Sequence, residues 1–237
     1  MANTVAPSVI LWSFFGGLLP TLVWLWFWLK EDPHPEPRRA LFRTLAAGAL
    51  AVPAALFLEQ IAVRAGGALG VFAPGVIGPG ILVVWALIEE VVKYIAAKKA
   101  ALDRVVYDEP VDAVIYLITA ALGFAAVENT LFLFRAFGET GTLSGIATGN
   151  LRFLGATLLH VVASGAVGLA LAFSFFHPRS RRANLAGGLF TATILHALFN
   201  ILIIKKGDSA IFMIFALLWV AAVATIFFFE KIKALRP

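Results

Sequence analysis

Long apolar stretches alternate with short polar connections along this chain. A helix needs about 20 mostly apolar residues to cross a bilayer. Seven stretches meet that length, at residues 8–29, 41–62, 80–97, 111–135, 150–176, 185–204 and 209–229. The pattern therefore predicts an all-α, polytopic membrane protein with about seven transmembrane helices.

The connections between these stretches are too short to form separate domains. Residues 30–39 are rich in charge and proline, whereas residues 66–80 are rich in glycine and proline and carry no charge. Both compositions are typical of turns between helices. We therefore expect residues 1–237 to form a single integral membrane domain.

Composition agrees with the pattern and narrows the chemistry. Hydrophobic residues make up 61% of the chain and charged residues only 14%, whereas soluble domains contain about 25% charged residues. Cysteine is absent, which excludes disulfides, thiolate metal ligands and a cysteine nucleophile. The chain has a net charge of +5. Its basic residues are expected to lie beside anionic lipid, because basic residues of membrane proteins gather at cytoplasmic headgroups. The expected partner is the lipid bilayer, and no nucleic acid is expected.

The distribution of lysine and arginine predicts the orientation. Most of these residues fall on one set of helix ends, which includes Lys30, Lys98, Lys99, residues 179–182 and Lys231. The positive-inside rule places that set in the cytoplasm. We therefore expect a multi-pass protein of the cell membrane with its amino terminus outside and its carboxyl terminus in the cytoplasm.

Polar side chains nevertheless occur inside four of the predicted spans. They are Glu89, Glu90 and Lys93 in the third, Glu128 in the fourth, His160 in the fifth, and His196 with Asn200 in the sixth. At about 1.5 Å per residue, one residue from each span lies roughly 10–14 Å below the same boundary. A charge at the centre of a spanning helix costs about 2.5–3.5 kcal/mol. The shared depth therefore predicts a polar site buried between spans three to six.

Glutamates and histidines in a recessed pocket suit hydrolysis. A carboxylate can take a proton from water as a general base, and two imidazoles with one carboxylate can hold zinc with an open position. The chain has no His-Glu-x-x-His segment and no serine in a Gly-x-Ser-x-Gly context. The alternative without catalysis is a polar network that holds the helices together.

Three motifs on these spans resemble the PrsW family of intramembrane proteases. They are Glu-Glu-Val-Val-Lys at residues 89–93, Gly-Phe-Ala-Ala-Val-Glu-Asn at residues 123–129 and His-Ala-Leu-Phe-Asn at residues 196–200. The similarity covers a catalytic core of about residues 80–204. It implies cleavage of a membrane-anchored protein, which in the family's best-known role is an anti-sigma factor cut on its extracytoplasmic side. Members of the family have been described both as metalloproteases and as glutamic proteases.

PrsW proteins in turn resemble the CAAX prenyl endopeptidases, from which this chain departs at one motif. Those enzymes carry Phe-x-x-x-His where this chain has Phe124-x-x-x-Glu128. A carboxylate thus stands in place of an imidazole. His160 is the residue expected to compensate.

The resemblance suggests a role for each polar residue. Glu89 is expected to activate water, while Glu90 and Lys93 fix its orientation and charge. Asn200 is expected to support the oxyanion, because a side-chain amide can donate a hydrogen bond to it.

The remaining three residues form the expected metal site. Glu128, His160 and His196 are expected to bind Zn²⁺ or to polarise the carbonyl group of the substrate. The expected activity is that of an intramembrane endopeptidase of the glutamic or metallo type, acting on a membrane-anchored protein.

Two other functions fit the same residues. Buried Glu, Lys and His side chains also mark the pathways of proton- or cation-coupled transporters. A protease-like protein could instead bind another membrane protein without cutting it.

Overall fold

The protein is a bundle of helices with no strand in the part of the chain that the structure describes. The computed structural model describes residues 7–71, 78–140, 142–206 and 211–235, with side chains except those within 138–154 and 205–211. The elements are α1 (Pro7–Glu31), α2 (Arg38–Ala68), α3 (Pro79–Ala97), the π-helical turn η1 (Lys98–Leu102), α4 (Pro110–Thr140), α5 (Thr142–Ala172), α6 (Arg181–Lys206) and α7 (Ile211–Lys233). The all-helical prediction is confirmed, although residues 209 and 210 of the last predicted span lie outside the described residues.

Six of the described helices are long and apolar enough to cross a membrane, which confirms a polytopic membrane protein. The exception is α3, which carries three charged residues: Glu89, Glu90 and Lys93. The helix that departs from the membrane pattern is therefore the one that brings most charge to the site.

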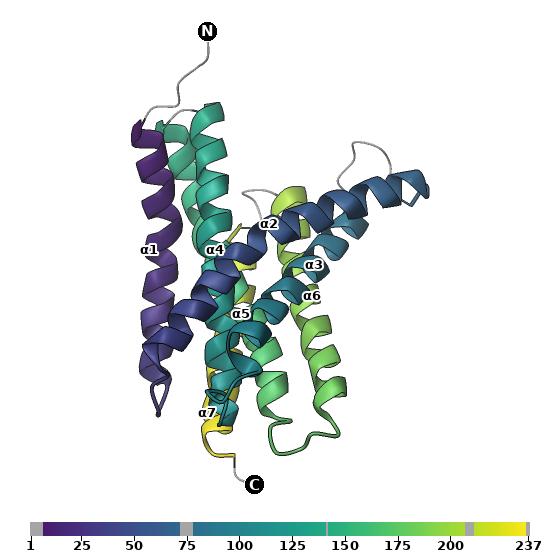
Figure 1. Cartoon of the computed structure of the whole chain (residues 1–237). Coiled ribbons are helices and arrows are strands. Elements are labelled where there is room, and N and C mark those ends of the chain that lie inside the picture. The colour runs from purple at the N-terminus through teal and green to yellow at the C-terminus, as the bar shows by residue number, and fades with distance from the viewer. Residues whose placement is uncertain (1–6, 72–77, 141, 207–210, 236–237) are drawn as a thin grey trace.

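Proline sets several of the helix starts. Pro79 and Pro110 are the first residues of α3 and α4, and Pro37 directly precedes α2. Proline suits a helix start because its fixed φ is already helical and its missing N–H would have no partner there. The proline-rich segment of residues 32–37 thus turns the chain sharply between α1 and α2 (Figure 1).

The centre of the bundle is formed by α4 and α5. In the apolar part of α4, 89% of the residues are buried, against 83% in α5, 28% in α2 and 17% in α1. The outer helices expose large apolar side chains such as Trp12, Phe42 and Phe212. Exposed apolar rings and chains on the periphery suit a protein whose surroundings are lipid rather than water.

Two glycines let α2 cross α4 at close range. A Cβ at Gly48 would overlap the Ala120 carbonyl, and a Cβ at Gly123 would overlap the Leu45 carbonyl. Small residues at such crossings let helix backbones approach each other in membranes. Figure 1 shows the consequence, since α2 and α3 run obliquely across the more upright α1, α4 and α5.

Candidate active site

Four helices bring the polar residues of the predicted spans together. The α3 helix contributes Glu89, Glu90 and Lys93, α4 contributes Glu128, α5 contributes His160 and α6 contributes His196. Hydrogen bonds and ion pairs join these six side chains into one continuous network. The structure thus confirms that spans three to six meet at a buried polar site. Asn200 lines a cavity beside the network.

Glu90 lies at the centre of the network and is fully engaged. Its Oε1 accepts hydrogen bonds from Lys93 Nζ at 2.8 Å and from His196 Nδ1 at 2.8 Å. Its Oε2 accepts a hydrogen bond from Ser164 Oγ at 3.0 Å. A buried carboxylate that already has three donors holds its neighbours in place and has little capacity left to accept a further proton.

The contact with Glu90 selects the tautomer of the neutral His196 ring. In that neutral form Nδ1 donates to Glu90, and Nε2 carries no proton and has its lone pair available. This nitrogen lies 3.8 Å from Glu89 Oε2. A carboxylate that holds one ring nitrogen so that the other can bind a metal is the usual partner of a ligating histidine.

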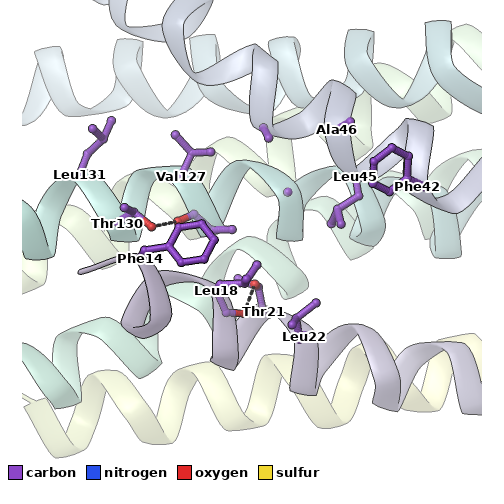
Figure 2. Close-up of a pocket in the computed structure, with 13 residues that line it drawn as sticks. Phe14, Leu18, Thr21, Leu22, Phe42, Leu45, Ala46, Val127, Thr130 and Leu131 are labelled. Carbon is purple, nitrogen blue, oxygen red and sulfur yellow. Dashed lines mark hydrogen bonds between the residues drawn. The ribbon is translucent and has the colours of Figure 1, made fainter. Parts of the chain in front are cut away.

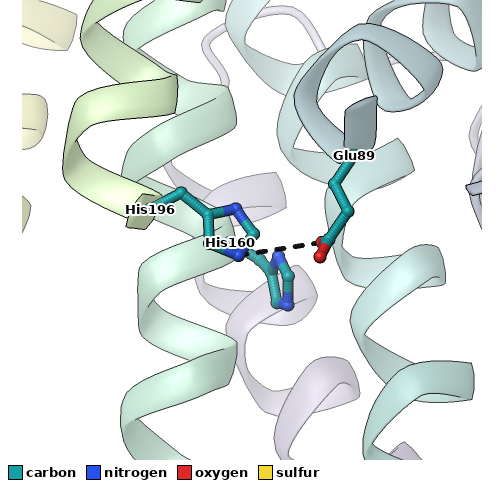
Figure 3. Close-up of side chains that lie close together, drawn as sticks. All are labelled: Glu89, His160 and His196. Carbon is teal, nitrogen blue, oxygen red and sulfur yellow. Dashed lines mark ion pairs between the residues drawn. The ribbon is translucent and has the colours of Figure 1, made fainter. Parts of the chain in front are cut away.

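Glu89 Oε2 is held by ion pairs with Lys93 and His196 rather than by hydrogen bonds. It is buried and accepts no hydrogen bond from any described residue. The nearest charged group is Lys93 Nζ, at 3.3 Å. This oxygen also lies 3.8 Å from His196 Nε2, so the carboxylate is placed to share a metal ion with that nitrogen, with Lys93 as its present counter-ion. Figure 3 shows Glu89, His160 and His196 converging there from three helices.

His160 is held from both sides. Lys93 Nζ donates to its Nδ1 at 2.8 Å, so Nε2 carries the proton and donates to Glu128 Oε2 at 2.7 Å. Lys93 also lies 4.5 Å from the centre of the Phe124 ring, within the range of a cation–π contact. Lys93 thus connects the motif of residues 89–93 to both His160 and the phenylalanine of the second motif.

The network opens to a small polar cavity on the side of Glu128. The cavity has a volume of about 60 Å³, and Glu128, His160, His196 and Asn200 contribute its polar walls. That is room for a few water molecules. The Glu128 side chain is 41% exposed, whereas that of Glu89 is 9% exposed. Of these two carboxylates, Glu128 is therefore the one that lines the cavity.

The residues present fit a metal ion. Glu89, His160 and His196 each offer one ligand atom, and these atoms lie within 4.8 Å of one another. Two imidazoles and one carboxylate form a common ligand set for catalytic zinc. This set differs from the expected one in one residue, because Glu89 takes the place of Glu128. Glu128 instead contacts His160 from the cavity side.

Sequence reasoning left two contributing residues out of the site. Ser164 lies one turn after His160, a spacing that places both on one face of α5, and it donates to Glu90. Glu59 of α2 lies close enough to Glu89 and Glu128 to interact with their charges. The helical spacing could have identified Ser164, whereas Glu59 depends on how α2 crosses the bundle.

A larger cavity lies elsewhere and has different chemistry. It measures about 280 Å³ and lies between α1, α2 and α4, with apolar walls that include Phe14, Phe42 and Val127 (Figure 2). Its two threonine hydroxyls donate to carbonyls of their own helices. This cavity therefore offers no free polar group for catalysis.

Comparison with known proteins gives one consistent result. The family model described as PrsW family intramembrane metalloprotease matches residues 36–228. Protease PrsW of Geobacillus kaustophilus is 27% identical over 92% of this chain and 86% of its own length. Protease PrsW of Oceanobacillus iheyensis is 24% identical over 87% of this chain and 91% of its own. The Bacillus subtilis protein of the same name is 26% identical over 50% of this chain and 52% of its own. No solved structure matches the chain.

Proposed function

The chain belongs to the PrsW family of intramembrane metalloproteases, and we propose that it hydrolyses a peptide bond of its substrate beside Glu89, His160 and His196. The observation that carries this proposal is the convergence of Glu89, His160 and His196, whose ligand atoms lie within 4.8 Å of one another. A network that only held helices together would not require two imidazoles and a carboxylate to meet at one point.

Glu89, His160 and His196 are the residues that would hold the metal ion, which we propose to be zinc. Nitrogen and oxygen donors in this ratio suit zinc, and the chain has no cysteine to favour a softer metal. When bound, zinc would polarise a carbonyl group and lower the pKa of a nearby water molecule. His160 uses both ring nitrogens in hydrogen bonds, so it would have to give up its contact with either Lys93 or Glu128 to bind the ion.

Glu128 is the proposed general base, which exchanges the roles first expected for the two glutamates. Its carboxylate reaches the polar cavity, whereas Glu89 is enclosed. Glu128 takes a proton from a water molecule in the cavity, and the hydroxide oxygen bonds to the carbonyl carbon of the substrate. As the C–N bond breaks, protonated Glu128 returns the proton to the leaving nitrogen. The products are a carboxylic acid, which releases its proton to solvent, and an amine.

Other residues of the site position these groups. Glu90 orients His196, and Lys93 balances the charge of Glu90 and Glu89. Lys93 is fully buried and does not line the polar cavity, so it is a positioning residue. Asn200 lines the cavity, where its amide can donate to the oxyanion that forms on the carbonyl oxygen.

The proposed substrate is a membrane-anchored protein of the anti-sigma-factor type, cut within the bilayer. Glu89 lies about 15 Å from the start of α3, at about 1.5 Å per residue. A substrate segment must therefore enter the hydrophobic layer to reach it. We propose the orientation with the amino terminus outside, because the basic helix ends favour it.

Cleavage of single-span reporter proteins by the purified protein tests the proposal. We expect the wild type to release product, and Glu128→Gln and His196→Ala to release none. Asp103→Asn is the matched control, because Asp103 is an exposed carboxylate that pairs with Lys98 away from the site. Equal product from wild type and Glu128→Gln would refute the assignment of the base, and full activity in metal-free protein would refute the role of zinc.

A further inference from the structure

A second cluster of carboxylates lies far from the proposed active site. Asp32 and Glu36 lie in the connection between α1 and α2, and Glu109 and Asp112 lie at the start of α4. Asp112 and Glu128 are both on α4, and their separation along the helix is about 24 Å at about 1.5 Å per residue. The acidic cluster, as we call these four residues, is therefore separate from the site that cuts the peptide bond.

Each carboxylate of the acidic cluster is held by one oxygen. Asp112 Oδ2 accepts hydrogen bonds from two backbone N–H groups, those of residues 108 and 109, at 2.9 Å each. Asp32 Oδ1 accepts from the backbone N–H of His34 at 3.1 Å. Glu109 Oε2 accepts from His34 Nδ1 at 2.9 Å, and Glu36 Oε2 accepts from the hydroxyl of Tyr116. Each of the four side chains thus has one oxygen held by a hydrogen bond.

The other oxygens of three of these carboxylates have no hydrogen-bond donor. Asp32 Oδ2, Glu109 Oε1 and Asp112 Oδ1 are buried and accept no hydrogen bond from any described donor, and the group within hydrogen-bonding reach of Asp112 is another carboxyl group, that of Glu36. Asp112 is fully buried, and Asp32 is only 6% exposed. Carboxylate oxygens without a donor are costly at such depth, so a proton or a cation between them stabilises the cluster.

The carboxylates lie close enough to repel one another. The carboxyl groups of Glu36 and Asp112 are within hydrogen-bonding reach of each other. Burial, together with the charges of Glu36 and Glu109, raises the pKa of Asp32 to about 6. The cluster therefore gains free energy from any positive charge that enters it.

The protein itself supplies little of that charge. Among the described residues, none of the four carboxylates forms an ion pair with a lysine or an arginine, and His34 is their one ion-pair partner. The charge of Arg43 acts on Tyr116, which donates a hydrogen bond to Glu36. By contrast, the glutamates of α3 have Lys93 beside them. Buried carboxylates without a cationic side chain are usually bound to a metal ion or protonated.

We propose that Asp32, Glu36, Glu109 and Asp112 bind a hard divalent cation, Ca²⁺ or Mg²⁺, which joins the α1–α2 connection to the start of α4. The donors are all carboxylate oxygens, which these two ions prefer and zinc does not require. Among the described residues, the set with three ligand atoms within 4.8 Å of one another is that of Glu89, His160 and His196. In the acidic cluster, carboxylate oxygens from three different residues lie farther apart than that. The acidic cluster must therefore contract around its ion, and binding should tighten this end of the bundle.

Cation titration of the full-length protein in detergent tests the proposal. After metal removal with a chelator, Ca²⁺ and Mg²⁺ are added separately while the unfolding temperature is recorded. Terbium luminescence excited through tryptophan reports the site directly, because Trp28 lies one turn before Asp32. We expect saturable binding with a dissociation constant between about 10⁻⁶ and 10⁻³ M, and competition between the three ions shows which of the two natural cations the site prefers.

Substitutions within the acidic cluster should abolish the response. Asp112→Asn keeps an oxygen for the two backbone N–H groups and removes the charge, so we expect it to fold and to bind the cation at least about tenfold more weakly. Glu109→Gln, at a partly exposed position, is the second variant if Asp112→Asn does not fold.

Two controls separate the acidic cluster from other sites. Asp103→Asn removes an exposed carboxylate and should leave terbium binding unchanged. His196→Ala removes a proposed zinc ligand and should also retain it, so this result does not depend on the proposed protease mechanism. The proposal is overturned if about 10 mM Ca²⁺ and Mg²⁺ both leave the unfolding temperature unchanged. It is also overturned if Asp112→Asn binds as the wild type does, or if only pH changes the stability of this end of the bundle.

Discussion

Replacing Lys93 with methionine should strongly destabilise the protein. Lys93 Nζ lies 2.8 Å from Glu90 Oε1, 3.3 Å from Glu89 Oε2 and 2.8 Å from His160 Nδ1. Methionine has a similar length but no charge, so two buried carboxylates would lose their cation. Breaking a buried ion pair by removing one partner costs about 3–5 kcal/mol. We expect a loss of unfolding free energy in that range.

A double-mutant cycle with Glu90→Gln isolates the interaction that causes this loss. In the wild type, Glu90→Gln removes a charge-assisted hydrogen bond, whereas in the Lys93→Met background that bond is already gone. We therefore expect the two substitutions to be non-additive by about 1.5–3 kcal/mol, the usual value of a hydrogen bond to a charged group. The measurement is reversible unfolding in detergent, followed by tryptophan fluorescence.

A matched lysine outside the site provides the control. Lys98 pairs with Asp103, but their side chains are 36% and 38% exposed, and exposed pairs contribute at most about 1 kcal/mol. Lys98→Met should therefore cost far less than Lys93→Met. If the two variants lost equal stability, or if the cycle at Glu90 were additive, Lys93 would not be the counter-ion of the site.

Three further predictions follow from the same structure. Glu128→Gln should lower the cleavage rate about 10²–10⁴-fold, as loss of a general base does, but keep bound metal, whereas metal analysis of His196→Ala should find none. Gly48→Val should lower the unfolding free energy by about 1–3 kcal/mol, because the valine side chain would overlap the backbone of α4. Gly67→Val is the control and should have nearly the unfolding free energy of the wild type, because a Cβ at residue 67 meets no other atom. For Asp32, the folded pKa of about 6 exceeds the ordinary aspartate pKa of 3.8. The folded state then binds more protons between these values, so cation-free stability should fall as pH rises from about 4 to about 6; Asp32→Asn should flatten that slope in unfolding experiments.

The sequence predicted the location of the site because depth in a membrane helix follows from residue number. Glu128, His160 and His196 belong to different helices, yet counting along each span placed them at one level. The cost of burying charge in lipid then left few explanations for polar residues at that level.

The sequence could not assign a role to each glutamate. Neighbouring residues of a helix point about 100° apart, so Glu89 and Glu90 had to differ, but the pattern did not say how. The structure gives Glu90 three hydrogen-bond donors, whereas Glu89 Oε2 has ion pairs with Lys93 and His196 but no hydrogen bond. That outcome depends on how α5 and α6 pack against α3, which the hydrophobic pattern of a single helix does not encode.

The acidic cluster was hidden for a similar reason. Glu36 and Tyr116 are 80 positions apart in the chain and meet only because α1, α2 and α4 end at the same place. Read alone, residues 30–39 are a charged, proline-rich turn of the kind that usually faces solvent. Only the tertiary contacts reveal that Asp32 and Glu36 are buried there.

Zinc titration of metal-free protein, with reporter cleavage as the readout, tests the central claim most directly. If Glu89, His160 and His196 hold a catalytic zinc ion, cleavage should be absent without metal and should saturate at one equivalent of zinc per chain. Glu89→Gln and His196→Ala should require far more zinc or remain inactive. Full cleavage by the metal-free wild type would contradict the account and leave the glutamates to act on water directly.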